Sequence, residues 1–393
     1  MALAQELHSF FDTFEALDDP RVERSRLHPL PEILLTTVCG VISGCEGWND
    51  IEAFARERLA FLRRFRPFEH GVPSDDTLRR VFRALDPDRF SELFEQWVGQ
   101  WYRAPGAGPD EGRPDRVAAP AHQIAIDGKT LRGSAEAGLG ALHQVSAFAT
   151  EARIVLAQQA VGEKTNEITA IPQLLEALDL TGATVTIDAI GCQRAIAERI
   201  VDGGGQYLLA LKANQPGLLE DVALAFESPP AGTRLEVDET LDKGHGRLER
   251  RRVRVCTGLD WLRECHPGWS SIGAVVEVEA EREALSGSAK GKIESKKRYY
   301  VASDRGLTAA GAQGAVRSHW QIENGLHWVL DMSFGEDASR VRRGHAVANL
   351  GVIRHAVLNA IRAVKPERES VKRMRKRAGW SEATLESVLQ QLI

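Results

Sequence analysis

The sequence lacks a long apolar run. The longest one near the amino terminus, residues 33–43, is too short to cross a bilayer and has no basic flank followed by a small-residue cleavage site. We therefore expect a cytoplasmic protein without a membrane span. Paired cysteines are also lacking, because the five present are odd in number and never spaced as CxxC: Cys39, Cys45, Cys192, Cys256 and Cys265. This pattern indicates neither a disulfide framework nor a cysteine zinc site.

No excess of basic charge is present over the whole chain. Lys and Arg total 50 against 55 Asp and Glu, a net charge of -5, so only local clusters can indicate nucleic-acid binding. With 393 residues, of which 43% are hydrophobic and 27% charged, the chain has a globular composition and is too long for one core. We expect two or three structural units.

Hydrophobic periodicity divides the chain. Residues 1–103 predict an all-α amino-terminal domain, in which Ser74 is the candidate N-cap of a helix that buries Leu78, Val81 and Phe82. Residues 104–120, rich in Gly and Pro without periodicity, predict a linker.

The hydrophobic pattern of the following region is typical of an α/β fold. Three strand-like runs are followed by helix, strand, helix and strand, at 123–126, 142–148, 153–160, 167–178, 184–187, 192–201 and 207–211. This order predicts a ribonuclease H-like core, in which the first three strands form a meander and the later strands extend the same sheet in parallel. We expect the core to span residues 121–231 and 306–364, with a β-rich insertion at 232–305 and a basic carboxy-terminal tail at 365–393.

Carboxylates follow two of these strands. Asp127 comes directly after the apolar run 124–126, and Asp188 directly after 185–187. Either one alone is explained as well by a turn aspartate. In the expected topology, however, the two strands are neighbours, so their ends lie about 5 Å apart, and like charges that close are costly unless a cation lies between them.

A third carboxylate lies on a helix predicted over residues 309–330. Ile322, Leu326 and Leu330 share an apolar stripe, and Glu323 lies at its margin. A solvated glutamate is the alternative. Phosphodiester chemistry uses two divalent ions about 4 Å apart, and Mg²⁺ prefers oxygen ligands. Asp127, Asp188 and Glu323 are therefore candidate catalytic residues and ligands for Mg²⁺ or Mn²⁺.

Several longer motifs carry a resemblance. They are Asp127-Gly-Lys and the runs at 163–168, 186–193 and 319–324, with His28-Pro-Leu, residues 44–48 and 73–77 in the amino-terminal part. The chain resembles the H-repeat-associated insertion-sequence transposases, of the ISAs type, which are DDE transposases. One departure is that Val316, His319 and Leu330 stand where the wider group often has Tyr, Arg and Lys.

The resemblance implies a metal-dependent enzyme that cleaves DNA at transposon ends and transfers the strand into target DNA. Its three acids match Asp127, Asp188 and Glu323. The implied partner is double-stranded DNA, both terminal inverted repeats and target, bound by a homodimer. Two alternatives remain open: a DDE-type nuclease without insertion activity, and a domesticated DNA-binding protein.

Two other site types are rejected. Gly128-Lys129-Thr130 is not a P-loop, because Gln123 stands where the first glycine is required. His319, Glu323 and His327 have helical spacing, but no HExxH occurs, so a zinc hydrolase is not indicated.

Basic clusters are candidate phosphate contacts, with solvated surface as the alternative for each. The DNA-binding candidates are Arg247, Arg250, Arg251, Arg252, Lys296, Lys297, His319, Arg340 and Arg342. A further cluster in the expected tail comprises Lys372, Arg373, Arg375, Lys376 and Arg377.

Overall fold

Helices form the amino-terminal part of the computed structural model, which describes residues 9–101, 117–118, 123–135, 140–161, 166–244, 246–286 and 290–393. The helices are α1 (Phe10–Phe14), α2 (Leu30–Ile42), α3 (Trp48–Glu57), α4 (Leu59–Leu62), α5 (Asp75–Ala84) and α6 (Pro87–Trp101). As predicted, Ser74 caps α5, accepting a hydrogen bond from Thr77 N at 3.3 Å. Most of the expected linker lies outside the described residues.

A nine-stranded mixed sheet forms the centre of the molecule, in the order β4-β3-β2-β6-β7-β11-β10-β9-β8. Its first five members are β2 (Gln123–Thr130), β3 (His143–Ala149), β4 (Ile154–Val161), β6 (Thr184–Ile187) and β7 (Gln206–Leu211). The meander β2-β3-β4 is antiparallel, whereas β2-β6 and β6-β7 are parallel. The prediction that the strands before Asp127 and Asp188 are neighbours is therefore confirmed.

Helices precede and follow the parallel strands β6 and β7. They are α7 (Glu167–Glu176), α8 (Arg194–Asp202) and α9 (Pro216–Glu227), and a short parallel pair joins β1 (Val117–Ala118) to β5 (Leu178–Asp179).

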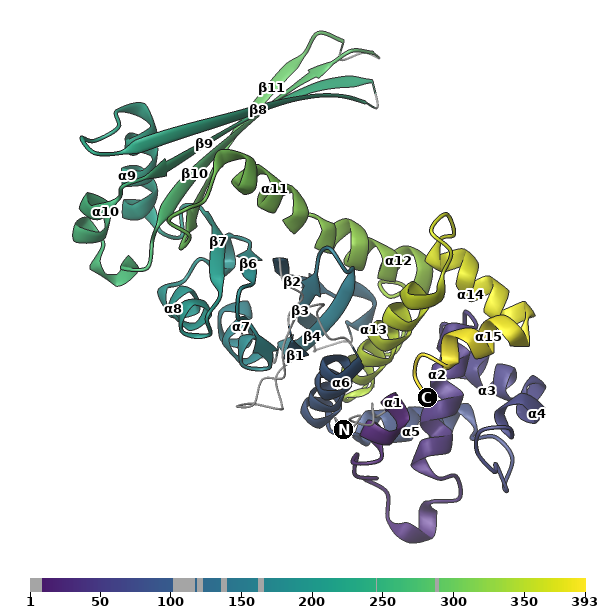
Figure 1. Ribbon diagram of the computed structural model, residues 1–393. Helices are drawn as coiled ribbons and strands as arrows, with labels where there is room; N and C mark the ends of the chain where they lie inside the picture. The colour runs from purple at the N-terminus through teal and green to yellow at the C-terminus, as the bar shows by residue number, and fades with distance from the viewer. Residues whose placement is uncertain are drawn as a thin grey trace, which may run out of the picture.

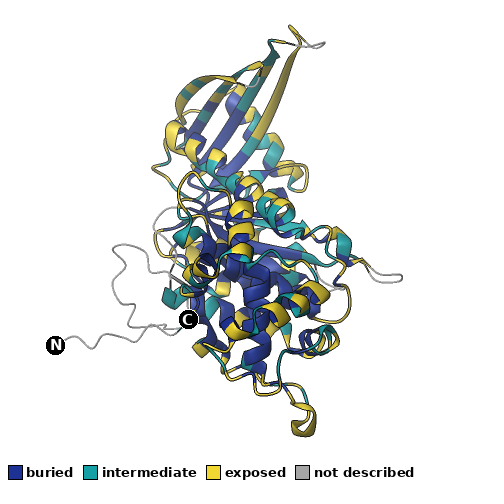
Figure 2. Ribbon diagram, turned by 90° about the vertical axis from the view of Figure 1, so that its right-hand side faces the viewer, coloured by how far each residue is buried: buried dark blue, intermediate teal, exposed yellow. Residues whose placement is uncertain are grey.

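The strands expected as an insertion continue the same sheet. They are β8 (Arg234–Gly244), β9 (Arg247–Thr257), β10 (Ala274–Ala284) and β11 (Ile293–Ala302), with α10 (Asp260–Cys265) between β9 and β10. β11 pairs with β7, so the long strands extend outward from the core sheet (Figure 1). Their outer ends are largely exposed (Figure 2). Near the core, Val253, Val276 and Val316 belong to a small apolar cluster between these strands and α11 (Ala309–His319).

The chain after α11 returns along the core. It forms a π-helical segment (Ile322–His327), α12 (Trp328–Phe334), α13 (Ala346–Val364), α14 (Val371–Trp380) and α15 (Glu382–Leu389). The helix predicted over 309–330 is therefore interrupted only at the turn residue Trp320, and it continues with π geometry from Ile322. Helix α13 is buried against α2, α5, α6 and β4, and α14 and α15 pack on α2 and α13. The segment expected as a basic tail is therefore helical and packed beside the amino-terminal helices (Figure 1).

One apolar core runs through the amino-terminal helices, the sheet and the last helices. The described residues thus form a mixed α/β fold with one large mixed sheet. Among them, no helix is both long and apolar enough to cross a membrane.

Candidate functional site

The two aspartates lie where the parallel ladder of β2 and β6 stops. Strand β2 continues to Thr130, so the prediction that the strand ends at residue 126 is wrong. The parallel pairing nevertheless stops at Ile126 and Ile187, and beyond it Asp127 pairs only with Ser146 of β3. Because β6 ends while β2 goes on, Asp127 and Asp188 both reach the same opening of the sheet.

All three predicted acids line one cavity of about 120 Å³. Asp127 and Asp188 come from the sheet and Glu323 from the π-helical segment. Cationic and aromatic side chains complete the wall: Lys212, Arg298, Tyr300, His319 and Trp320. Within the part of the chain that the structure describes, no three His, Cys, Asp or Glu side chains are arranged closely enough to hold a metal ion as they stand.

Asp127 is the most perturbed of the three acids. Burial, together with the nearby carboxylates of Glu167, Asp188 and Glu323, raises its pKa to about 7, although a hydrogen bond from the Gly128 backbone acts to lower it. Negative charge is therefore concentrated here without full compensation.

His327 does not supply that compensation. Its Nδ1 lies 3.5 Å from Asp127 Oδ2. Burial, followed by the charge of Lys129, lowers the pKa of His327 to about 3, so the imidazole is neutral near pH 7. In the described residues its Nε2 is buried without a hydrogen-bond partner.

Asp188 is held by its own backbone and by a lysine. Its Oδ1 accepts a hydrogen bond from Ile190 N at 2.9 Å, capping the 3-10 turn Ala189–Gly191. Its Oδ2 lies 3.6 Å from Nζ of Lys212, which follows β7. This exposed lysine is the nearby cation that neutralises part of the carboxylate.

Glu323 is presented by a widened helical turn. Ile322 and Leu326 are fully buried on one side of the π-helical segment, while Glu323 is exposed on the other. The preceding helix is tied to the sheet, since His319 Nδ1 and Thr186 Oγ1 are hydrogen-bonded at 3.0 Å. His319 is thus both hydrogen-bonded to the sheet and part of the cavity wall.

Sequence reasoning missed the role of Glu167, the first residue of α7. Its Oε1 lies 2.5 Å from Nε2 of His143 on β3. Gly128 provides the room, because a Cβ there would lie 2.5 Å from His143 Nε2 and 2.6 Å from Glu167 Cδ. The signal that could have found it was the motif at 166–168, which is part of the resemblance but had no role assigned to any of its residues. Glu163, Lys164 and Thr165 of that motif lie outside the described residues.

Lys129 pairs with carboxylates that follow Glu323 in the chain. Its Nζ lies 2.9 Å from Glu336 Oε2 and also contacts Asp331. Glu336 is buried and lies 3.6 Å from Arg354 as well, which makes it a counterion inside the fold.

The arginine cluster on β9 is divided between the two faces of the sheet. Residues alternate faces along a strand, so Arg251 faces the opposite way from Arg250 and Arg252. These three arginines therefore do not share one face of the sheet, and their contact with DNA stays a prediction. Arg252 pairs with Glu239 at 3.2 Å, and Lys297 lies 3.9 Å from Glu277 on that same outer face.

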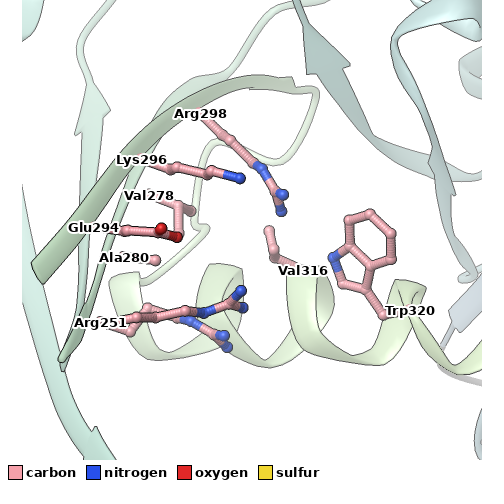
Figure 3. Close-up of a pocket in the computed structure, with 9 residues that line it drawn as sticks. Arg251, Val278, Ala280, Glu294, Lys296, Arg298, Val316 and Trp320 are labelled. Atoms are coloured by element: carbon pink, nitrogen blue, oxygen red, sulfur yellow. The ribbon is translucent and has the colours of Figure 1, made fainter. Parts of the chain in front are cut away.

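The inner face carries a basic surface next to the acidic cavity. A second cavity of about 50 Å³ is lined by Arg251, Arg282, Lys296 and Arg298, with Trp320 on α11's side (Figure 3). The two cavities share Arg298, Val316 and Trp320. The Arg298 guanidinium lies 5.2 Å from the centre of the Trp320 ring. A basic and aromatic surface therefore leads directly to the three acids.

The remaining basic candidates are elsewhere. Arg247 is exposed at the start of β9, and Arg340 and Arg342 line a cleft beside the amino-terminal helices. Arg375 is buried and donates to the carbonyl oxygens of Val41 at 2.9 Å and Ser333. Its proposed role in neutralising phosphates is wrong, because its guanidinium is used inside the fold.

Comparisons with known proteins show the family of the chain. The family model described as Transposase DDE domain matches residues 119–360, and the model described as DDE_Tnp_1-associated matches residues 11–98. The chain is 37% identical to the "H repeat-associated putative transposase YhhI" of Escherichia coli K12, covering 98% of both chains. It is also 37% identical to the "Putative transposase YncI" of E. coli O157:H7, over 98% of this chain and 95% of that protein.

A shorter relative and a solved structure complete the comparison. The "Inactive transposase YbfQ" of E. coli K12 is 43% identical over 76 residues, 19% of this chain and 90% of the relative. A piggyBac transposase synaptic complex with hairpin DNA matches with a TM-score of 0.43 and 12% identity, covering 97% of this chain and 77% of that one. With family models along both parts and full-length relatives above 30% identity, the chain belongs to the DDE-domain transposase family.

Proposed function

We propose that the chain catalyses metal-dependent cleavage of DNA at transposon ends and transfer of the strand into target DNA. The observation that carries the proposal is the single cavity lined by Asp127, Asp188 and Glu323, in which burial, together with the neighbouring carboxylates, raises the pKa of Asp127. The order β4-β3-β2-β6-β7, with helices between the parallel strands, supports a ribonuclease H-like core as its frame.

The donor set fits magnesium or manganese. Asp127, Asp188 and Glu323 offer only carboxylate oxygens, the donors that Mg²⁺ prefers, and their mutual repulsion favours a divalent cation. Bound divalent ions would activate an oxygen nucleophile and stabilise the leaving oxygen. Because the side chains are not closely arranged as they stand, they must turn inward to ligate, and Asp188 must loosen its contact with Lys212.

Residues around the acids would orient the DNA. Lys212 and Arg298 line the same cavity and would attract phosphate oxygens, while Arg251 and Lys296 would continue the contact along the inner face. Trp320, which is 38% exposed beside Arg298, offers a flat ring against which a base can stack. We therefore propose double-stranded DNA, as terminal repeat and as target, for the partner. Action as a homodimer stays a prediction.

The test is metal-dependent nicking of a labelled transposon-end duplex, followed by joining of a pre-cut end to plasmid. Mg²⁺ or Mn²⁺ is expected to support both steps, and Ca²⁺ to support binding without turnover. Glu323→Gln should bind the duplex but lose both steps by about 10²-fold or more. Full cleavage in chelator would overturn the proposal. Nicking without joining would identify the alternative, a DDE-type nuclease.

A further inference from the structure

A second basic cleft lies away from the acids, between the amino-terminal helices and the loop that follows α12. Its volume is about 420 Å³. Five arginines line it, two from α5 and three from the loop before α13: Arg79, Arg83, Arg340, Arg342 and Arg343. Glu46 is the one carboxylate among the lining residues. Residues more than 250 positions apart in the chain thus bring their guanidinium groups to one place.

Hydrogen bonds fix the loop before α13 against the end of α5. His345 N donates to Arg83 O at 3.3 Å, and Gly344 adopts a φ of +57° in which a Cβ would lie 2.9 Å from that same carbonyl. Asn349, at the start of α13, donates to Phe82 O and Leu85 O, each at 3.0 Å. These bonds join the loop to the carboxy-terminal end of α5, so the two groups of arginines keep one spacing.

The same loop is joined to the strand that carries Asp127. Arg342 Nε donates to Gly133 O at 2.9 Å, and a Cβ on Gly133 would lie 2.5 Å from Asp337 O. Gly133 follows β2 by three residues, and the loop follows the helix after Glu323. The cleft is therefore held in fixed register with the elements that supply two of the three acids.

The cleft is positively charged in a chain whose net charge is -5. Arg79 is partly neutralised by Asp75 at 2.7 Å, but Arg83, Arg340 and Arg342 are exposed. Clustered exposed arginines repel one another and are favoured where anions bind. Their planar guanidinium groups match the paired oxygens of phosphate.

We propose that this arginine cleft binds the phosphate backbone of double-stranded DNA at a distance from the cleaved bond. This inference rests on the proposed function, since a DNA substrate is needed to occupy both surfaces. Contacts from two units, α5 and the loop after α12, hold the duplex in register with the acidic cavity. The amino-terminal helices thereby take part in DNA binding, a role that their sequence alone did not identify.

The test is fluorescence anisotropy of the full chain with a labelled 30-bp duplex in Ca²⁺, over a series of salt concentrations. The double substitution Arg83→Gln and Arg340→Gln should reduce the slope of log affinity against log salt by about 2, at about 0.9 per phosphate contact. Arg80→Gln is the matched control, because Arg80 lies on the same helix, is 68% exposed and does not line the cleft. It should leave the slope nearly unchanged.

Equal slopes for the double variant and the wild type, with both folded by thermal melting, would overturn the proposal. So would protection by millimolar inorganic phosphate against arginine modification in the cleft without protection by duplex, which would indicate a small-anion site. Binding is measured without turnover, so failure of the cleft leaves the metal-dependent cleavage test of Glu323→Gln intact. Conversely, a chain that binds through the cleft but never cleaves would contradict only the proposed activity.

Discussion

The Lys129 ammonium lies 2.9 Å from Glu336, so the strand that carries Asp127 also supplies the counterion for a carboxylate beyond Glu323. Arg354 lies 3.6 Å from the same carboxylate. Burial disfavours ionisation of Glu336, but the two cations outweigh it and lower its pKa. Glu336 is thus part of the internal packing, and Glu323 is the acid that faces the cavity.

This relationship predicts different effects of two matched substitutions. Glu336→Gln leaves the buried Arg354 without its carboxylate and Lys129 with Asp331 alone, and should lower the free energy of unfolding by about 3 kcal/mol. Glu323→Gln should change it by less than about 0.5 kcal/mol, because the side chain is exposed. Urea unfolding measures both. A folded Glu336→Gln variant that is inactive, beside a Glu323→Gln variant that cuts normally, would move the third ligand downstream.

The raised pKa of Asp127 predicts a pH-dependent stability in metal-free protein. Its folded pKa of about 7 exceeds its ordinary value of 3.8, so the folded chain retains a proton that the unfolded chain has lost between those values. Stability should fall as pH rises through this window and level off above it. Asp127→Asn should therefore be more stable than the wild type at pH 8, by on the order of 1–4 kcal/mol, but not at pH 3.5.

Thermal and urea unfolding across pH check this expectation. Addition of Mg²⁺ at pH 8 should stabilise the wild type and not Asp127→Asn. Glu264→Gln, which removes an exposed carboxylate on α10, serves as the control. A difference between Asp127→Asn and wild type that is the same at every pH would contradict the electrostatic origin.

The close approach at Gly128 predicts a substitution that damages the site. Gly128→Ala would force the hydrogen-bonded pair of His143 and Glu167 apart, with an expected cost of about 1–3 kcal/mol. Because Glu167 lies beside Asp127, the Mg²⁺ concentration for half-maximal cleavage should rise about tenfold. Gly314→Ala, in α11 with open space around it, should stabilise by up to about 1 kcal/mol and leave the metal requirement unchanged. Identical metal titrations for the two variants would rule out a role of the pair in the site.

The division of β9 and β11 into two faces predicts that neighbouring basic residues differ in their effect on DNA binding. Replacing Arg251 and Lys296 together with Ala removes two cations of the inner face and should reduce the salt slope by about 2. Replacing Arg250 and Lys297 together, on the outer face, should reduce it by less than about 0.5. Anisotropy titrations at several salt concentrations compare the pairs. The reverse order of effects would place the DNA on the outer face.

The buried guanidinium of Arg375 predicts a loss of stability without a loss of DNA affinity. Arg375→Lys cannot reach all the carbonyl oxygens of Val41, Cys45 and Ser333, and should destabilise by about 2–3 kcal/mol. Lys376→Ala, on the same helix and exposed, should change stability by less than about 0.5 kcal/mol. Denaturant unfolding and duplex binding below the transition separate the two effects. Weakened binding by fully folded Arg375→Lys would return this residue to the DNA surface.

Local sequence patterns determined many of the helices and strands. The apolar run Thr184–Ile187 is the strand β6 with the predicted bounds, and Ser74 caps α5, because short strands and caps depend on neighbouring residues. The two aspartates could be paired from sequence, since the predicted order places their strands side by side and parallel, and the carboxyl ends of parallel neighbours lie at the same edge of a sheet. Glu323 could be proposed from its motif and its place beside an apolar stripe.

Only the tertiary structure decided what depends on distant segments. The pairing of β11 with β7 makes the expected insertion continue the core sheet, and no local periodicity specifies which strands become partners. Lys129 and Glu336 are 207 residues apart, and Glu167 meets His143 only because Gly128 leaves room between them. Charged residues look alike in sequence whether buried or solvated, so Arg375 inside the fold and the inner and outer arginines of β9 could be distinguished only once packing and strand faces were known.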